Sequence, residues 1–163
     1  MILICYDGSP DAQSAIDRAG DLLAGKAAIV LTIWEPFIDV MARSGAGLAF
    51  GSGTVEVDEI DAASEKGAKE RAEEGVERVK KVGLNAQPRT RARLGTVAET
   101  ILTEAGELDA EAIVMGTRGL TGLKSVLLGS VSHAVVQHAN RPVVVVPSAE
   151  VAAARAAGGA EKP

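Results

Sequence analysis

Residues 112–147 read AIVMGTRGLTGLKSVLLGSVSHAVVQHANRPVVVVP, and this stretch decides the fold. It opens with the apolar run 112–115 and closes with four consecutive valines, 143–146. Such short runs, rich in β-branched residues, are typical of strands that are buried on both faces. Between them, Gly129-Ser130 opens an amphipathic helical pattern, and Asn140-Arg141-Pro142 ends it. The stretch therefore predicts a strand, a helix and a second strand in succession.

The rest of the chain repeats this alternation. Further strands are predicted at 2–6, 27–34 and 85–94. Helices are predicted from Ser9-Pro10, over about 55–82, and from the capping-box pattern Thr96–Glu99. Residues 35–54 break all periodicity, and we expect them to form a long loop. The order of strands and helices predicts an α/β fold, a parallel sheet with helices on both faces, in which ligands bind beyond the carboxyl ends of the strands.

Composition limits the classes of function. The 163 residues carry a net charge of −5 and only 2% aromatic residues, which argues against a nucleic-acid-binding protein. No apolar run approaches the roughly 20 residues that span a bilayer, and the N-terminus lacks the basic region of a secretory signal. We therefore expect a cytoplasmic protein without a membrane partner. The lone Cys5 excludes an intramolecular disulfide, and the Ala/Gly-rich segment 148–163 is expected to be a partly disordered tail.

Two segments at predicted strand ends have the chemistry to bind a nucleotide. Asp7 follows the first strand, where its carboxylate can accept hydrogen bonds from a ribose hydroxyl or an amino group. Gly116 and Gly119 follow the fourth strand and let the backbone approach phosphate oxygens closely. After nine intervening residues, the segment 129–132 places backbone N–H groups and two hydroxyls at a helix N-terminus, which favours an anion. Together these segments predict a nucleotide site.

Simpler interpretations of the same residues remain open. Asp7 can serve only an Asx turn that supports Ser9, and the glycines can be ordinary turn residues. Cys5 can be a small buried hydrophobe rather than a nucleophile. Arg118 and Lys124 can add positive charge to the site or lie on the surface.

The sequence lacks the residue patterns that a metal site, a P-loop or a hydrolase site needs. His133 and His138 are five residues apart on one helix and project in different directions, which argues against a metal site. The spacing in 119–125 is not that of a P-loop. Neither histidine has an evident serine or cysteine partner, which argues against a hydrolase.

The glycine spacing, the opening ILICYDGSPDAQSAIDRA and the closing RPVVVVP together resemble the universal stress protein family, up to about residue 147. The resemblance implies a Rossmann-like domain over 1–147, an open five-stranded parallel sheet of order 3-2-1-4-5. The complete glycine motif implies the ATP-binding branch, with Mg²⁺ bound through the phosphates. It also implies a homodimer through the strand Pro142–Pro147.

The resemblance also assigns roles to individual residues. Asp7 would contact the ribose or adenine, with Cys5 near the base. Ile33 would receive the adenine edge through its backbone, and Met115 would pack under the base. The phosphates would be held by Gly116, Gly119, Gly129, Ser130, Val131 and Ser132. Because aromatic residues are scarce, we expect aliphatic side chains to hold the adenine. We also expect Trp34 to lie beside the pocket, where its fluorescence would report ATP.

The function expected from the sequence is an ATP-binding regulatory module of the stress response, which acts on an unknown protein partner and is at most a slow ATPase. A signalling protein that binds AMP or cAMP is one alternative. Another is an enzyme of related architecture that splits ATP at the α-phosphate. Enzymes of that kind use a Ser-Gly-Gly-x-Asp-Ser-type loop after the first strand, and residues 7–11 depart from it.

Overall fold

The structure is a computed structural model that describes residues 1–44, 57–119 and 128–159. Five strands form one sheet in the order β3-β2-β1-β4-β5, and each neighbouring pair is parallel. The strands are β1 (Ile2–Cys5), β2 (Ala27–Trp34), β3 (Asn85–Ala92), β4 (Ala112–Gly116) and β5 (Val143–Val146). The expected α/β class and strand order are confirmed. Because the chain leaves β1 toward β2 on one side and reaches β4 on the other, strand order reverses between β1 and β4.

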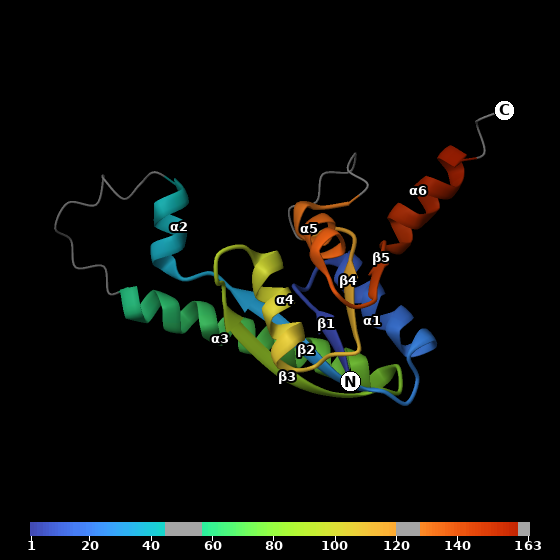
Figure 1. Ribbon diagram of the computed structural model, residues 1–163, viewed down its shortest axis with the longest axis horizontal. Coiled ribbons are helices and arrows are strands. Elements are labelled where there is room, and N and C mark those ends of the chain that lie inside the picture. The colour runs from blue at the N-terminus through green and yellow to red at the C-terminus, as the bar shows by residue number, and fades with distance from the viewer. Residues whose placement is uncertain (45–56, 120–127, 160–163) are drawn as a thin grey trace.

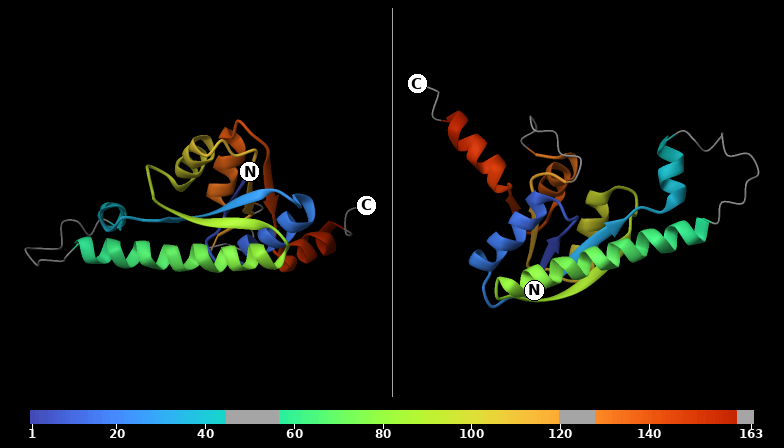
Figure 2. Two further views of the ribbon diagram at one scale, coloured as in Figure 1. Left: turned by 90° about the horizontal axis from the view of Figure 1, so that it is seen from below. Right: turned by 180° about the vertical axis from the view of Figure 1, so that it is seen from behind.

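Helices cover both faces of this sheet (Figure 1). On one face lie α1 (Pro10–Leu22) and α3 (Val57–Lys81), which pack on Ile4, Val30 and Val114. On the other lie α4 (Val97–Glu107) and α5 (Ser130–His138), which pack on Leu3, Leu31 and Ile113. The edge-on view in Figure 2 shows these layers. None of the described helices is long and apolar enough to cross a membrane.

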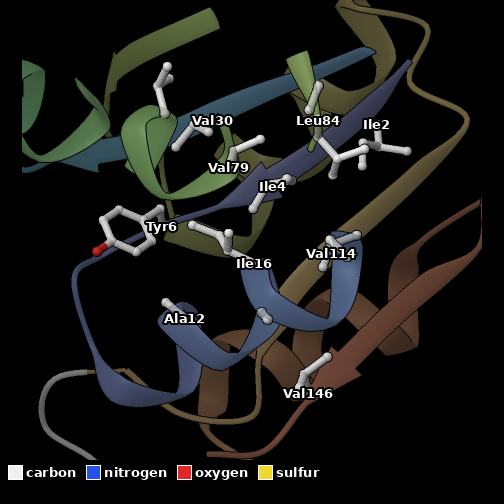
Figure 3. Packing of buried hydrophobic residues seen from close by; sticks show 14 of the residues in the cluster. Ile2, Ile4, Tyr6, Ala12, Ile16, Val30, Val79, Leu84, Val114 and Val146 are labelled. Carbon is white, nitrogen blue, oxygen red and sulfur yellow. The ribbon is translucent and has the colours of Figure 1, made fainter. Parts of the chain in front are cut away.

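The core is aliphatic, as Figure 3 shows for the α1 and α3 face. One close approach of a helix to the sheet is at Gly75 of α3. A Cβ atom there would lie 2.8 Å from Val30 Cγ1 and 2.9 Å from the ring of Tyr6. Because such distances are shorter than any ordinary packing contact, a glycine is required for α3 to lie against β2 and Tyr6.

Two helix starts follow directly from the sequence. The Ser9 hydroxyl accepts the Ala12 N–H at 3.2 Å and caps α1, with Pro10 at the first helical position. At α4, Thr96 and Glu99 form the predicted capping box in both directions. These caps satisfy backbone N–H groups that have no partner inside the helix.

The prediction that 35–54 form a loop without regular structure was wrong for its first part, because α2 (Phe37–Ser44) is a helix. A residue distant in sequence supports its start: the Phe37 N–H donates to the Asp61 carboxylate of α3 at 2.6 Å. Eight residues are too few to form a stable helix alone, so α2 depends on tertiary contacts such as this one. Local periodicity does not indicate such contacts, and the helix was therefore missed. The predicted loop at 45–54 lies outside the described residues.

The edge strand β3 is tied to α4 by a buried carboxylate. Glu104 is 3% exposed and accepts from both Arg89 Nε and Arg91 Nε. Both guanidinium groups also reach Glu107 Oε2, at 3.4 and 3.2 Å. Charge pairing therefore holds a strand whose sequence alternates only weakly between polar and apolar residues.

Candidate functional site

A cavity of about 730 Å³ opens at the carboxyl ends of β1 and β4, where strand order reverses. It is bounded by the ends of β1, β2 and β4 and by the first turns of α4 and α5. All ten residues predicted for the nucleotide site line it: Cys5, Asp7, Ile33, Met115, Gly116, Gly119, Gly129, Ser130, Val131 and Ser132. The fold thus brings together residues as far apart in the chain as Cys5 and Ser132. Their contacts with a ligand stay a prediction.

One end of the cavity is apolar. Leu31 and Ile33 of β2 face Val97 and Ile101 of α4, and Met115 of β4 lies in the same cluster. Val97 and Ile101 were not predicted as site residues, although their four-residue spacing places them on one helix face. These aliphatic side chains, here called the slot, give this end of the cavity an apolar lining.

The backbone of Ile33 is turned toward this slot. Leu31 C=O accepts the Tyr6 N–H on the β1 side, whereas Trp34 C=O accepts the Arg93 N–H on the β3 side. Since successive peptide groups alternate between the two edges of a strand, the Ile33 N–H and C=O are directed to the β1 side. β1 ends at Cys5, and in the β1–β2 register Cys5 is opposite Leu31. The two groups therefore lie beyond the end of β1, where a ligand can meet them.

Asp7 has two roles in the site. Its Oδ1 accepts the Ser9 N–H at 2.9 Å, which is the Asx turn that orders the start of α1. Its Oδ2 points across the cavity mouth to Gly119, where an added Cβ would lie 2.7 Å away. Gly8 supports this turn with a φ of +84°, a conformation that favours glycine. The structure thus contains the Asx turn and also leaves one carboxylate oxygen directed at the cavity.

The opposite end of the cavity is the N-terminus of α5. Gly129 is its N-cap, and no side chain caps the helix. The Ser132 hydroxyl donates to Thr117 C=O at 2.7 Å, and the Gly129 N–H donates to the same oxygen at 2.7 Å. These bonds hold α5 against the end of β4, while Ser130 is exposed at the cavity. A helix N-terminus without a side-chain cap favours an anion.

Gly116 is required for the fold of the site rather than for access to it. A Cβ there would lie 2.7 Å from the carbonyl carbon of Asp11 and 2.8 Å from the backbone nitrogen of Ala12. Backbone atoms of α1 cannot move aside as a flexible side chain would. The end of β4 therefore approaches α1 closely because residue 116 has no side chain.

A buried carboxylate that the sequence did not single out lies beneath the site. Asp11 is 4% exposed and accepts from the Thr117 hydroxyl and, at 3.5 Å, from Arg118 Nε. Burial raises its pKa, but hydrogen bonds from Thr117, Ser148 and Arg118 outweigh burial and lower it. Of the two interpretations left open for Arg118, the structure favours the site, because Arg118 lines the cavity while it is paired with Asp11. Lys124 lies outside the described residues.

The surroundings of Cys5 disfavour the thiolate form of its side chain. Burial, and next the charge of Asp7, raise the pKa of its thiol from 9.0 to about 12. The thiolate is the reactive form, so a raised pKa makes the sulfur inert near neutral pH. The thiol contributes apolar surface beside the slot.

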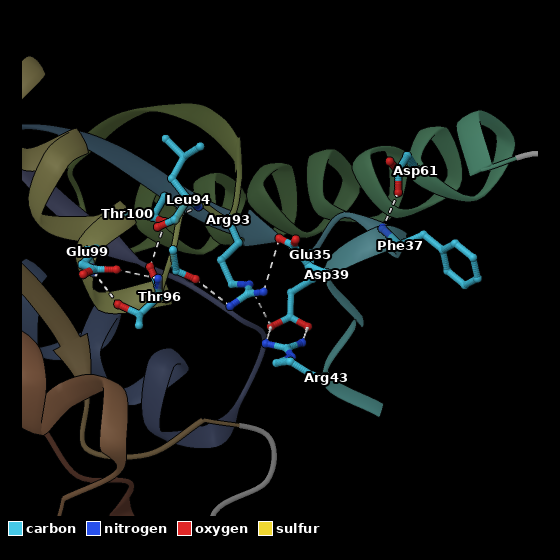
Figure 4. A network of polar contacts seen from close by, with 11 residues as sticks. Glu35, Phe37, Asp39, Arg43, Asp61, Arg93, Leu94, Thr96, Glu99 and Thr100 are labelled. Atoms are coloured by element: carbon cyan, nitrogen blue, oxygen red, sulfur yellow. Dashed lines mark hydrogen bonds and ion pairs between the residues drawn. The ribbon is translucent and has the colours of Figure 1, made fainter. Parts of the chain in front are cut away.

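Charged residues at the rim join the cavity to α2, as Figure 4 shows. Glu35 lines the cavity and is held by Arg43 of α2 through both carboxylate oxygens. Arg93 lies 3.6 Å from Glu35 and 3.3 Å from Asp39 and donates to Gly95 C=O at 2.6 Å. Hydrogen bonding from Arg43 lowers the pKa of Glu35. Alternation along β2 places Glu35 on the same side as Leu31 and Ile33, a signal that could have identified it.

The prediction that Trp34 lies beside the pocket was wrong. Ile33 and Glu35 line the cavity, and Trp34 is not among the described residues that do so. The two-residue period of a strand turns its side chain to the opposite face of the sheet, the face that carries α3. Its fluorescence is therefore not a direct reporter of the cavity.

No group of three or more metal-ligating side chains occurs among the described residues. His133 and His138 are both exposed on α5.

This geometry defines a doubly wound α/β protein with a crevice at its switch point, the place where such folds bind ligands. Residues 1–147 match the universal stress protein family, and the chain belongs to this family. The universal stress protein YxiE of Bacillus subtilis is 32% identical over 147 residues, which cover 89% of this chain and 97% of that protein. A universal stress protein of Thermus aquaticus is 35% identical over 149 residues, covering 89% and 96%. The solved structure of the Archaeoglobus fulgidus universal stress protein in complex with dAMP is 25% identical, with a TM-score of 0.59, and covers 89% of this chain and 95% of that one.

Proposed function

We propose that this protein binds an adenine nucleotide, ATP, in the cavity between β1 and β4 and acts as a nucleotide-dependent regulatory module of the stress response. The observation that carries the proposal is that the two ends of one cavity differ in chemical character. The β2 end is the aliphatic slot, and the other end is the N-terminus of α5, which no side chain caps. The dAMP complex of the Archaeoglobus relative supports an adenine nucleotide as the ligand class.

The slot would set the orientation of the ligand. The adenine ring would enter between Ile33 and Met115, and the Ile33 N–H and C=O would pair with a ring nitrogen and the amino group. Asp7 Oδ2 would accept a hydrogen bond from a ribose hydroxyl. The backbone at Gly119 and Gly129–Ser132 would hold the phosphates. Because the Ser132 hydroxyl already donates to Thr117, Ser132 would offer its backbone N–H.

Magnesium would arrive with the phosphates. The described residues form no cluster that would hold a cation alone, whereas phosphate oxygens with one carboxylate suit Mg²⁺. Asp7 is the carboxylate nearest Gly119 and could contact the ion or its waters.

We infer binding with at most slow hydrolysis. The carboxylates among the described lining residues are Asp7 and Glu35. One oxygen of Asp7 is used by the Asx turn, and Arg43 lowers the pKa of Glu35, which makes it a weak base. A general base works best with a pKa near the operating pH. Release of phosphate, or of AMP and pyrophosphate, at several turnovers per second would contradict this inference.

Isothermal titration with Mg-ATP tests the site directly. Asp7→Ala removes the ribose contact and the turn together, whereas Asp7→Asn keeps an oxygen for the Ser9 N–H and replaces only the oxygen that faces the cavity. A hydrogen bond to a charged group contributes about 1.5–3 kcal/mol, so both variants should weaken binding by about 10- to 100-fold. Gly119→Ala places a Cβ 2.7 Å from Asp7 Oδ2 and should weaken binding by at least about tenfold.

Gly106→Ala is the matched control, because a Cβ at this α4 glycine meets nothing within 4 Å. It should bind as the unaltered chain does. Absence of Mg-ATP binding by the unaltered chain would refute the proposal.

AMP and cAMP remain the alternative ligands, and the monophosphate in the Archaeoglobus complex favours testing them. Thermal shift with equal concentrations of ATP, AMP and cAMP ranks them, since at one concentration the stabilisation of the folded state increases with the logarithm of the affinity. Larger stabilisation by cAMP than by ATP would replace ATP as the proposed ligand.

We also propose a homodimer through the β5 edge, Pro142–Pro147. The carbonyls of Pro142 and Val146 accept N–H groups from the β4 side, so alternation turns the peptide groups of Val143 and Val145 outward. Val145→Pro removes one outward N–H and leaves the bonds to β4 in place. It should convert a dimer to a monomer in analytical ultracentrifugation, with unchanged circular dichroism. A dimer of undiminished stability would refute the β5 interface.

A further inference from the structure

Glu35 places a charge beside the aliphatic slot. It lines the cavity two residues beyond Ile33, on the same face of β2, and directly follows the last residue of that strand. Backbone pairing with the β3 side continues to this point, because the Arg93 N–H donates to Trp34 C=O at 2.8 Å. Two residues of an extended strand span about 6–7 Å, which is comparable to the length of a purine ring system. A base whose edge meets the Ile33 peptide groups would therefore come close to Glu35.

Two arginines hold the Glu35 carboxylate in this position (Figure 4). Arg43, in the last turn of α2, donates to Oε1 at 3.1 Å and also donates to Oε2. Arg93 Nε lies 3.6 Å from Oε1. The Arg93 side chain is only 12% exposed, pairs with Asp39 at 3.3 Å and donates to Gly95 C=O at 2.6 Å. The carboxylate is thus held from two sides before any ligand arrives.

The Glu35 carboxylate offers acceptors and no donor to a ligand. Its two oxygens have about four lone-pair sites, and Arg43 uses one on each oxygen. The sites that remain can accept a hydrogen bond from a ligand, whereas a carbonyl oxygen of a ligand would be repelled. The two guanidinium groups favour the ionised form, and a hydrogen bond to an ionised acceptor is stronger than a neutral one. This part of the cavity therefore favours a base edge that carries a donor.

We propose that Glu35 selects a 6-aminopurine over a 6-oxopurine by accepting a hydrogen bond from the exocyclic amino group, and this inference rests on the proposed function. The amino group of adenine has two hydrogens, of which one would go to Ile33 C=O and the other to Glu35. A base with a carbonyl oxygen at the same ring position, such as hypoxanthine, loses both bonds and places that oxygen against a carboxylate. Arg43 and Arg93 are positioning residues, because they act on the base through Glu35.

Isothermal titration with Mg-ATP and Mg-ITP tests this selection, because the two bases differ only in the group at position 6 and the proton on the neighbouring ring nitrogen. The unaltered chain should bind ATP at least about tenfold more tightly than ITP. Glu35→Gln supplies an amide that accepts from an amino group and donates to a carbonyl oxygen. ITP binding should tighten while ATP binding weakens, and together these changes should lower the preference for ATP by about tenfold.

Arg43→Ala tests the positioning role. It releases the Glu35 carboxylate on the α2 side, and because the pair is partly exposed the preference for ATP should fall by about threefold. Arg155→Ala is the matched control. It removes the same charge from an exposed position on α6 (Ala149–Gly159), which projects from the opposite side of the protein in Figures 1 and 2. This variant should keep the preference of the unaltered chain.

Each outcome decides a different claim. A preference for ATP that is unchanged in Glu35→Gln, or an unaltered chain that binds ITP as tightly as ATP, overturns the selection and leaves nucleotide binding standing. Equal weakening of both nucleotides in Glu35→Gln also overturns it, because Glu35 would then support the shape of the site and not the choice of base. An unchanged preference in Arg43→Ala overturns the positioning role of Arg43. Absence of Mg-ATP binding by the unaltered chain overturns the proposed function and the selection with it.

Discussion

The Cys5 thiol gives a quantitative test of the cavity, because it is the one cysteine of the chain. Burial, and next the charge of Asp7, raise its pKa from 9.0 to about 12. At pH 8 an ordinary thiol of pKa 9.0 is about 10% thiolate, whereas one of pKa 12 is about 0.01% thiolate. The reactive fraction in the folded protein is therefore about 1,000-fold smaller.

The higher nucleophilicity of the remaining thiolate offsets part of this loss. A thiolate of higher pKa is a better nucleophile, with a Brønsted slope of about 0.4–0.5, and a shift of about three units then gives a gain of about 20-fold. The net expectation is that folded protein reacts about 50-fold more slowly than unfolded protein at pH 8, before any steric protection.

Reaction with Ellman's reagent at pH 8, followed in buffer and in concentrated urea, measures this ratio. Asp7→Asn removes the smaller of the two causes and should speed the folded reaction only modestly. Mg-ATP should slow it further, since Cys5 lines the proposed nucleotide cavity. A folded protein that reacts within a few-fold of the unfolded chain would refute the raised pKa of this thiol and the environment assigned to the cavity.

Three further predictions concern stability. Gly116→Ala should lower the free energy of unfolding in urea by at least about 1–3 kcal/mol, because its Cβ meets the α1 backbone at Asp11. The control Gly106→Ala should not be destabilising, and equal urea midpoints for the two variants would contradict this prediction. Glu104→Gln removes the buried charge that two partly exposed arginines share and should cost about 1.5–3 kcal/mol by chemical denaturation. A loss below about 1 kcal/mol would show that the pairing is weak. Burial, and next hydrogen bonding to Glu74, raise the pKa of Tyr6 from 10.0 to about 12. The stability that neutral Tyr6 contributes is therefore complete below pH 10 and is lost as the pH rises through 12. Between pH 10 and 12, the free energy of unfolding should fall less steeply in Tyr6→Phe than in the unaltered chain.

The strands and the two side-chain caps could be predicted from sequence because each depends on residues close together in the chain. The run Val143–Val146, the Ser9-Pro10 start and the Thr96–Glu99 box carry their signals within a few residues. By contrast, α2 depends on Asp61, which is 24 positions from Phe37. No local pattern reports such a contact.

The site divides in the same way. Asp7 and the glycines stand at strand ends, so the topology of a parallel sheet brings them together once the strands are known. Asp11 and Glu35 were missed because their importance comes from burial and partners: Thr117 and Arg118 for one, Arg43 and Arg93 for the other. Trp34 was misplaced by one step of the two-residue strand period, which sends its side chain to the other face of the sheet.

The alternatives that the sequence left open at Asp7 are not exclusive, since a carboxylate has two oxygens with separate environments. Oδ1 is committed to the Ser9 N–H, and Oδ2 faces Gly119 across the cavity. The turn holds the carboxylate in place before any ligand arrives, which reduces the entropy lost on binding. Thr117 likewise makes structural hydrogen bonds with two separate groups: its carbonyl accepts from Ser132 and anchors α5, while its hydroxyl donates to Asp11. Structural hydrogen bonds at this switch point therefore do not argue against a nucleotide site, because they are what fixes its geometry in advance.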